Sequence, residues 1–406
     1  MASLTPDGWI LFAARGLRMF ANGFLSLVLV TFLRAEGLGE AAIGLLLSMT
    51  LLGDVVISLG ITTQADQLGR RRMLILGALL MTFAGAVFTL TSDYTFLLIA
   101  ATVGVLSPSD KEVGPFLSIE QATLSQEISA EDRTNVFAWY NLIGSLTAAL
   151  GSLAGGFVAA HLLEAGHVPL EAYRPVVAAY GVVGLILVGT FLLLSPRAEV
   201  TEAPKETPSW FGLGSSREVV LRLSALFALD AFGGGFIVQS LIAHWFDIRY
   251  RLDPAMLGSV FFMANLLAAA SALAASAIAE RIGLVQTMVF THLPSNVMLI
   301  LVPLMPSAEW AIGLYLLRCS ISQMDVPTRQ SYTMSVVEPH ERSAAAGITT
   351  IARSIGAALA PLLAGLLLAQ PALIDAPLFI AGGVKIVYDL WLYRAFVSEA
   401  NLPPPA

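Results

Sequence analysis

The stretch ADQLGR at residues 65–70 lies between two long apolar runs, and a similar stretch, AERIGL, returns between two others at residues 279–284. The offset between them is 214 residues, about half of the 406-residue chain. Two further pairs of similar stretches have offsets of 209 and 212 residues: 131–156 with 340–365, and 18–24 with 230–236. Three matches in chain order at nearly one offset predict that the chain consists of two related halves.

The composition places these halves in a membrane. Hydrophobic residues make up 56% of the chain and charged residues only 13%, whereas soluble domains carry about 25% charged residues. A helix needs roughly 20 apolar residues to cross a bilayer, and long apolar runs favour helices over the alternating pattern of a β-barrel. We therefore predict an all-α membrane protein of twelve transmembrane helices in two pseudo-symmetric six-helix halves. The twelve apolar segments are 10–33, 40–64, 73–92, 95–125, 135–162, 175–195, 219–246, 255–279, 284–304, 309–336, 343–369 and 376–396.

The longest interruption of this pattern is residues 196–218, which are rich in Pro, Ser, Gly and charge. We interpret it as a cytoplasmic linker between an N-terminal half, 1–195, and a C-terminal half, 219–406. With the N-terminus inside, the inner loops hold eleven of the 22 Lys and Arg residues and the outer loops four. Basic residues favour the cytoplasmic side. We expect both termini in the cytoplasm and the chain in a bacterial-type inner membrane.

The loop that contains ADQLGR also carries a family resemblance. The sequence resembles the major facilitator superfamily over essentially its whole length. The hallmark of that family is a loop between helices two and three with the pattern Gly-x-x-x-Asp-Arg/Lys-x-Gly-Arg-Arg/Lys. Asp66, Gly69, Arg70 and Arg71 match this pattern, whereas the first glycine and the first basic position are replaced. The resemblance implies that this loop latches the cytoplasmic side; the alternative is that its arginines only anchor the topology.

Two further features are similar to the same family. Glu127 and Arg133 resemble a Glu…Arg pair that follows helix four, and we assign both, with Glu120, to the cytoplasmic gate. Residues 151–156, GSLAGG, resemble a Gly-Pro-x-x-Gly-Gly motif of drug/proton antiporters, with Ser152 in place of the proline. The alternative for these glycines is close helix packing.

Charged residues within the apolar segments are expensive unless they are paired or face water. Of fourteen such residues, ten lie on the first, fourth, seventh and tenth segments, and the resemblance implies that these four helices line a central cavity. The other four are Asp54, Arg353, Lys385 and Asp389. We predict that the substrate and ion cavity contains Arg15, Arg18, Asp110, Lys111, Glu112, Asp230, Arg318, Asp325 and Arg329.

The position of each charge along its segment refines this prediction. Prolines and a glycine in 107–115 indicate a break in the fourth helix, and Pro327 indicates another after Asp325. The repeat puts Arg18 opposite Asp230 and Glu120 opposite Arg329. These opposite charges suit salt bridges that close the inner end; permanent structural pairing is the alternative. Lys385 and Asp389, four residues apart, are expected to form a local pair.

These observations favour a secondary transporter that moves a small organic solute by alternating access. Proton coupling requires a buried carboxylate that can take up a proton, and the candidates are Asp110, Glu112, Asp230 and Asp325. Proton-coupled efflux is the leading hypothesis; the alternatives are uptake or exchange of an organic anion, and a non-transporting membrane sensor. We expect no enzyme activity, because the sequence has no Ser/His/Asp grouping and no phosphate-binding Gly-Lys loop. We also expect no cofactor and no nucleic-acid partner, and no metal site because the five His show no ligand spacing. The expected partners are the solute, protons and membrane lipid, with a monomer as the functional form.

Overall fold

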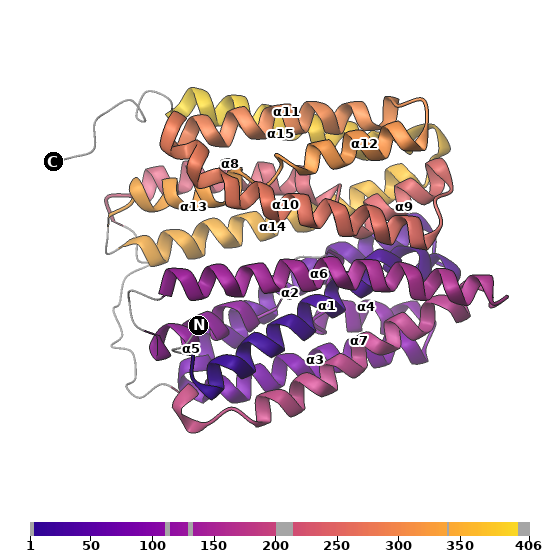
Figure 1. The fold of residues 1–406 in the computed structure, drawn as a ribbon, viewed down its shortest axis with the longest axis horizontal. Coiled ribbons are helices and arrows are strands. Elements are labelled where there is room, and N and C mark those ends of the chain that lie inside the picture. Colours follow the sequence, from indigo (N-terminus) through magenta and orange to yellow (C-terminus); the bar gives the residue numbers. More distant parts are fainter. Residues whose placement is uncertain (1–3, 110–113, 129–132, 200–213, 339–340, 397–406) are drawn as a thin grey trace. The chain divides into compact units, whose positions relative to one another are not determined.

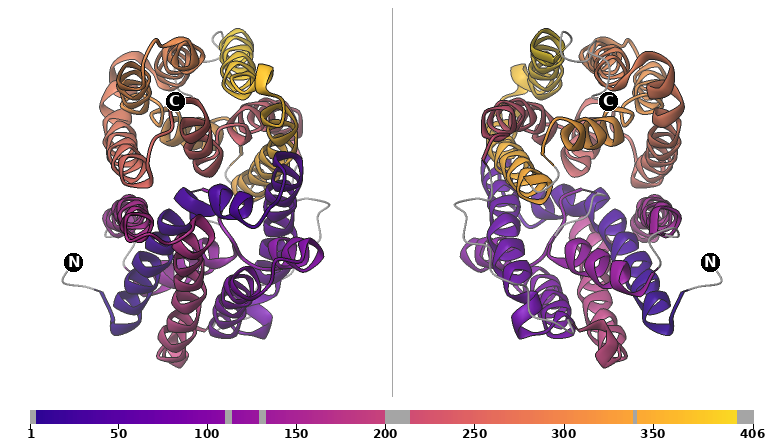
Figure 2. Two further views of the ribbon diagram at one scale, coloured as in Figure 1. Left: turned by 90° about the vertical axis from the view of Figure 1, so that its right-hand side faces the viewer. Right: turned by 90° about the vertical axis from the view of Figure 1, so that its left-hand side faces the viewer.

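The computed structural model describes residues 4–109, 114–128, 133–199, 214–338 and 341–396, and the regular elements in these ranges are helices (Figure 1). They belong to two compact units. Unit 1 holds α1–α7, α9 and the start of α10, and unit 2 holds α8, the rest of α10 and α11–α15. Figure 2 looks along the helices of each unit. The expected linker includes residues 200–213, which lie outside the described ranges, so the proposed division at 196–218 stays a prediction.

Unit 1 is built from long helices that alternate with short connections. Its first helix begins where Thr5 caps the backbone N–H of Gly8 at 3.1 Å and Pro6 occupies the first helical position, which needs no donor. The helices of this unit are α1 (Pro6–Ala35), α2 (Glu40–Leu68), α3 (Arg70–Leu90), α4 (Tyr94–Val103), α5 (Phe116–Glu127), α6 (Arg133–Glu164), α7 (Pro169–Leu192), η1 (Pro196–Ala198), α9 (Gln239–Tyr250) and the start of α10 (Pro254–Ile282).

Unit 2 repeats the plan. Its helices are α8 (Arg217–Gly235), the rest of α10, α11 (Leu284–Leu301), η2 (Val302–Leu304), α12 (Ala308–Cys319), α13 (Asp325–Ser335), α14 (Arg342–Leu368), η4 (Pro371–Leu373) and α15 (Ala376–Phe396). Within unit 1, α1 packs against α6 and α7, and α3 packs against α7. Within unit 2, α8 packs in the same way against α14 and α15, and α11 against α15.

Nine helical stretches in the described ranges are long and apolar enough to cross a membrane. Three predicted spans remain: α4 with α5, α12 with α13, and α15, which carries Lys385 and Asp389 in its middle. Together they give the twelve predicted spans. The prediction of an all-α membrane protein with two related six-helix halves is confirmed.

Matching glycines bring two helices into close contact in each unit. A Cβ atom on Gly23 of α1 would lie 2.0 Å from the carbonyl oxygen of Ala148 on α6. A Cβ atom on Gly235 of α8 would lie 2.3 Å from the carbonyl oxygen of Ala357 on α14. Both contacts need a residue without a side chain, and they occupy equivalent positions of the repeat, at offsets of 212 and 209. Close backbone approach at small residues is the usual way in which membrane helices associate.

The two copies of the quoted loop also have the same backbone. Gly69 separates α2 from α3 with φ +102°, and Gly283 separates α10 from α11 with φ +90°. Residues that carry a side chain rarely adopt such a positive φ, so glycine is required at both of these turns. The expected tight turn at Gly69 is confirmed.

Two spans are interrupted near their middle, as the prolines predicted. In the fourth span α4 ends at Val103 and α5 begins at Phe116, and just before α5 the backbone N–H of Gly114 donates a 2.5 Å hydrogen bond to Asp54 of α2. That carboxylate satisfies a donor which a continuous helix would have used itself. The tenth span is interrupted before Asp325 rather than after it, because Pro327 is accommodated in the first turn of α13.

Candidate functional site

Unit 1 contains a buried ion pair between α1 and α5. The two terminal nitrogens of Arg18 donate to the two carboxylate oxygens of Glu120, both at 2.8 Å. The Tyr140 hydroxyl of α6 donates to the same carboxylate, and the Arg18 guanidinium lies 4.4 Å from the centre of the Phe116 ring. Arg18 is 1% exposed and Glu120 is fully buried. The pair is therefore bidentate, dry and supported on both sides.

Arg15 lies one turn before Arg18 and faces the same neighbour. Its Nε donates to the Tyr140 carbonyl oxygen at 2.9 Å, and its Nη2 donates to the Asn141 side chain at 3.3 Å. Its guanidinium also lies 4.3 Å from the centre of the Tyr140 ring. Arg15 thus ties α1 to α6 beside the ion pair.

Unit 2 contains a larger network centred on Asp230 of α8. One carboxylate oxygen of Asp230 lies 2.5 Å from Nζ of Lys385 on α15. The other lies 3.1 Å from Arg329 of α13 and 3.6 Å from Arg353 of α14. Arg329 also bonds Asp325, one turn earlier on its own helix, at 2.9 Å. Asp230 therefore has cationic partners on three other helices.

The network continues onto α11 through His292. Its Nε2 lies 3.8 Å from Asp230, and its Nδ1 lies 2.7 Å from Asp389 of α15. The Asn296 amide donates to the second oxygen of Asp389 at 2.9 Å. Asp389 is fully buried and His292 is 4% exposed. A titratable histidine thus bridges two buried carboxylates.

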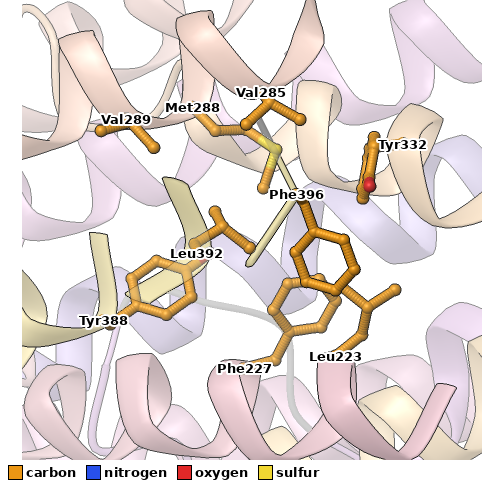
Figure 3. Packing of buried hydrophobic residues seen from close by; sticks show 9 residues of the cluster. All are labelled: Leu223, Phe227, Val285, Met288, Val289, Tyr332, Tyr388, Leu392 and Phe396. Carbon is orange, nitrogen blue, oxygen red and sulfur yellow. The ribbon is translucent and has the colours of Figure 1, made fainter. Parts of the chain in front are cut away.

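An apolar cluster lies one helical turn from this network and fixes the same helices (Figure 3). Phe227 precedes Asp230 by three residues, Met288 precedes His292 by four, and Tyr332 follows Arg329 by three. The cluster consists of Leu223, Phe227, Val285, Met288, Val289, Tyr332, Tyr388, Leu392 and Phe396. Side chains from α8, α11, α13 and α15 therefore exclude water on this side, which strengthens the charge interactions beside it.

Arg318 differs from the other buried arginines. It lies in the last turn of α12, directly before the interruption of the tenth span, and is 9% exposed. Its Nε is buried without a hydrogen-bond partner, and among the described residues no carboxylate lies within ion-pair distance of it. Its guanidinium lies 6.0 Å from the centre of the Tyr315 ring on the same helix. Arg318 has the character of a guanidinium available to an anion.

The predicted gate loop is held by a carboxylate that sequence reasoning did not select. Glu199, after η1, accepts hydrogen bonds from the backbone N–H groups of Arg70 at 2.6 Å and Arg71 at 3.3 Å. It therefore caps the N-terminus of α3, where unpaired donors and the helix dipole favour a negative charge. The side chains of Asp66, Glu127 and Arg133 lie outside the described part of the chain.

Several site predictions meet the structure directly. Arg18, Asp230, Glu120 and Arg329 are all buried and charge-paired inside their own units: Arg18 bonds Glu120, and Asp230 bonds Arg329. The expected gate bridges between equivalent positions of the two halves stay a prediction. Asp110, Lys111 and Glu112 lie outside the described residues.

The expected local pair of Lys385 and Asp389 is wrong. Although four residues apart, the two side chains have different partners: Lys385 bonds Asp230, and Asp389 bonds His292 and Asn296. Burial explains the difference, because each charge finds a stronger partner on a neighbouring helix than on its own.

His292 and Asn296 are the site residues that sequence reasoning missed. Both stand in the apolar run 284–304, and a spacing of four puts them on one face of a helix. Two strongly polar residues on one face of a membrane helix were the available signal; a search for metal-ligand spacing does not detect it.

Comparisons with known proteins agree with this architecture. The family model of the Major Facilitator Superfamily matches residues 11–361. An uncharacterized membrane protein of Saccharomyces cerevisiae is 29% identical over 420 residues, which covers 96% of this chain and 94% of that protein. The nucleoside transporter NupG has a similar fold with a TM-score of 0.73 at 13% identity, covering 97% of this chain and 99% of that one.

Two further solved structures are similar. A bacterial homolog of the human lysosomal transporter Spinster, in an inward-facing and unoccupied conformation, has a TM-score of 0.71 at 15% identity, covering 98% of both chains. A D-xylose-proton symporter has a TM-score of 0.71 at 12% identity, covering 95% of this chain and 97% of that chain. At these identities the structural likeness bears on the fold.

Proposed function

Since this chain belongs to the Major Facilitator Superfamily, a family of transporters of small solutes, we propose that it is proton-coupled and exports its solute. The buried network around Asp230 carries the proposal. A carboxylate with partners on α11, α13, α14 and α15 can exchange them as a proton arrives or leaves. Its helices would then respond to protonation, which is what coupling by alternating access requires.

The physical argument is one of charge balance. An ionised Asp230 compensates Lys385 and Arg329, which are themselves buried, and burying an uncompensated charge costs several kcal/mol, on the order of 3–5. A proton on this network changes its sum by one charge and so changes which helix arrangement is favoured. The proton gradient can thereby bias the equilibrium between two conformations, provided that each binds the proton with a different affinity.

The direction of transport rests on residues 151–156 of α6. In the structure Gly151 and Gly155 lie against the backbone of α1, where a Cβ atom would come within 2.1 Å and 2.6 Å of the Phe20 and Phe24 carbonyl oxygens. Ser152, at the position of the motif proline, bonds the Gly23 carbonyl oxygen at 3.3 Å. This stretch sets a close contact between α1 and α6 in unit 1, a place where a motif can govern conformational change.

Transport by the purified chain in proteoliposomes tests the proposal. A pH gradient of one unit is imposed, and the fluxes of uridine, D-xylose, ethidium and succinate are followed. We expect at least one solute to be driven against the direction of proton flow. The Asp230→Asn variant should lose gradient-driven flux, while Glu280→Gln, an exposed acid at the end of α10, should retain it. Gradient-driven flux that is unchanged in Asp230→Asn contradicts the proposed coupling.

A second candidate, uptake or exchange of an organic anion, is favoured by Arg318. A buried guanidinium that has no carboxylate partner among the described residues offers bidentate donors to a carboxylate or phosphate group. Under this alternative succinate is driven and ethidium is not, and Arg318→Gln raises the succinate concentration needed for half-maximal flux at least tenfold. Arg318→Lys keeps the positive charge but loses the paired N–H donors of the guanidinium. Its succinate concentration for half-maximal flux should therefore lie between those of the wild type and Arg318→Gln.

The proposal also includes the remaining expectations: cytoplasmic termini, a bacterial-type inner membrane and a functional monomer. A fluorescent protein fused at either terminus should be bright in intact cells if both termini are cytoplasmic. A sensor with the same fold would bind a solute of the panel but show no flux in the proteoliposomes.

A further inference from the structure

The acidic residues of the network around Asp230 differ in the number and type of their ion-pair partners. Asp230 has two cations within 3.1 Å and a third at 3.6 Å, and Asp325 is bonded to Arg329. Asp389 differs from both. Among the described residues no Lys or Arg lies within ion-pair distance of Asp389, and its one ion-pair partner is His292.

That partner is itself titratable. Arginine keeps its proton in proteins, and Lys385 lies 2.5 Å from the Asp230 carboxylate, so the Arg and Lys members each have an acidic partner. Histidine is the side chain whose ordinary titration falls between pH 5 and pH 8. His292 and Asp389 are therefore the two members of the network between which a proton is not assigned by a fixed charge.

We propose that the proton which drives transport is carried by the His292–Asp389 pair of α11 and α15, on two helices outside the four expected to line the cavity. This inference rests on the proposed proton coupling and deepens it by naming the carrier. It replaces none of the carboxylate candidates as partners in the network; it moves the proton from them to a pair that sequence reasoning did not select.

Formal charges support the assignment. Asp230, Asp325 and Asp389 contribute three negative charges, and Arg329, Arg353 and Lys385 contribute three positive charges. With a neutral imidazole the network sums to zero, and with one added proton to +1. The pair also faces the Asn296 amide of α11, 3.2 Å from Nδ1 of His292, and the Tyr388 ring of α15, 5.9 Å from the His292 ring centre. Asp325 and Lys385 act electrostatically on His292 as well. One proton is thus the smallest change that unbalances a buried and otherwise neutral assembly.

The two ring nitrogens explain how that proton would be felt by α8. Nδ1 lies at hydrogen-bond distance from Asp389, while Nε2 faces Asp230 at 3.8 Å. A neutral ring that donates through Nδ1 has a lone pair on Nε2, and this lone pair points at the Asp230 carboxylate. Both groups are then acceptors, and no hydrogen bond joins them. When a proton binds Nε2, the ring becomes a donor to both carboxylates and competes with Lys385 and Arg329 for Asp230. When it leaves, the same nitrogen releases it and the earlier bonds return.

Two isosteric variants test this carrier, Asp389→Asn and His292→Gln, with His161→Gln and Glu280→Gln as exposed controls. Transport of one proton per solute predicts an accumulation ratio of about tenfold for a one-unit pH gradient. We expect the wild type and both controls to approach that accumulation ratio. Each test variant should keep an accumulation ratio near one, which means no accumulation. Solute exchange without a gradient should persist in the test variants, which shows that they are folded. Asp389→Glu should recover accumulation in part.

A measurement without solute complements the flux. Acid titration of the purified chain from pH 8 to pH 5 should show about one proton fewer bound by each test variant than by the wild type, beyond the change seen in His161→Gln. Full accumulation in both test variants, or unchanged proton binding by them, overturns the assignment while leaving proton coupling intact. A wild type whose flux ignores the pH gradient overturns the proposed coupling itself.

Discussion

The ion pair of unit 1 and the ion network of unit 2 occupy equivalent positions of the repeat with the charges reversed. Arg18 of α1 corresponds to Asp230 of α8, and Glu120 of α5 corresponds to Arg329 of α13, at offsets of 212 and 209. In unit 1 the bridge has one acid and one base, joined in two hydrogen bonds. In unit 2 three acids, three bases and a histidine share the same place. One scaffold thus holds both a fixed pair and an assembly whose members can exchange partners.

The largest effect that separates the two regions is expected from Glu120→Ala. Removing this carboxylate leaves the Arg18 guanidinium buried without its bidentate partner, and breaking a buried pair costs about 3–5 kcal/mol of unfolding free energy. Chemical unfolding in detergent measures it. The control is Glu218→Ala, which removes an exposed pair with Arg222 and should cost no more than about 0.5 kcal/mol.

A double variant sharpens this prediction. Arg18→Met combined with Glu120→Met removes both charges and keeps apolar volume, so most of the lost free energy should return. If the double variant is as unstable as Glu120→Ala, packing around the pair rather than the unpaired charge accounts for the loss, and the description of unit 1 as a fixed pair is wrong.

Asp230→Asn should cost less than Glu120→Ala, although Asp230 has more ionic partners. Arg329 keeps its bond to Asp325, and the oxygen of the new amide still accepts from Lys385, so about 1.5–3 kcal/mol is expected, the range for lost hydrogen bonds to charged groups. The same unfolding assay applies. Adding Lys385→Met to Asp230→Asn restores a formal sum of zero and should recover part of the loss. A cost equal to that of Glu120→Ala removes the distinction between the two regions.

The sequence predicted the scaffold of this comparison better than its contacts. Composition and the repeat predicted twelve helices in two related halves, and prolines predicted the interruptions near 107–115 and Asp325. The cost of charge in hydrocarbon identified Arg18, Glu120, Asp230 and Arg329 as buried polar sites. The rotation of each helix and its neighbours depend on packing between distant segments, which no local pattern encodes.

His292 and Lys385 illustrate that limit. A spacing of four residues suggested that Lys385 pairs with Asp389, yet Lys385 reaches α8 and Asp389 reaches α11. His292 carries no formal charge in a count of charged residues, so the search that found its partners passed over it. A helical wheel places His292 and Asn296 on one face of their helix, and this is the part of the site that the sequence alone could have revealed.

The helix contact shared by the two units predicts equal sensitivity. Gly23→Ala and Gly235→Ala each put a methyl group against a carbonyl oxygen, at 2.0 Å and 2.3 Å before relaxation. Each should lower the unfolding free energy by about 1–3 kcal/mol, the usual cost of overpacking. The control is Gly313→Ala on α12, where a Cβ atom meets nothing within 4 Å. A difference of more than a factor of two between the test variants means that the two units depend on this helix contact unequally.

The smallest expected difference concerns the two loops that bind helix N-termini. Glu199 accepts from the backbone N–H of Arg70 at the start of α3, and Glu341 accepts from Gly214 at 2.5 Å and Ser216 at 3.0 Å, just before α8. Glu199→Gln and Glu341→Gln keep one acceptor oxygen and remove the charge, so each should cost about 0.3–1 kcal/mol at low ionic strength. Glu341 is 2% exposed, whereas Glu199 is half-buried. Added salt should therefore shrink the effect of Glu199→Gln more than that of Glu341→Gln. If both effects vanish together in salt, burial does not protect the Glu341 contact, and the two caps are alike in a way that the ion pair and the ion network are not.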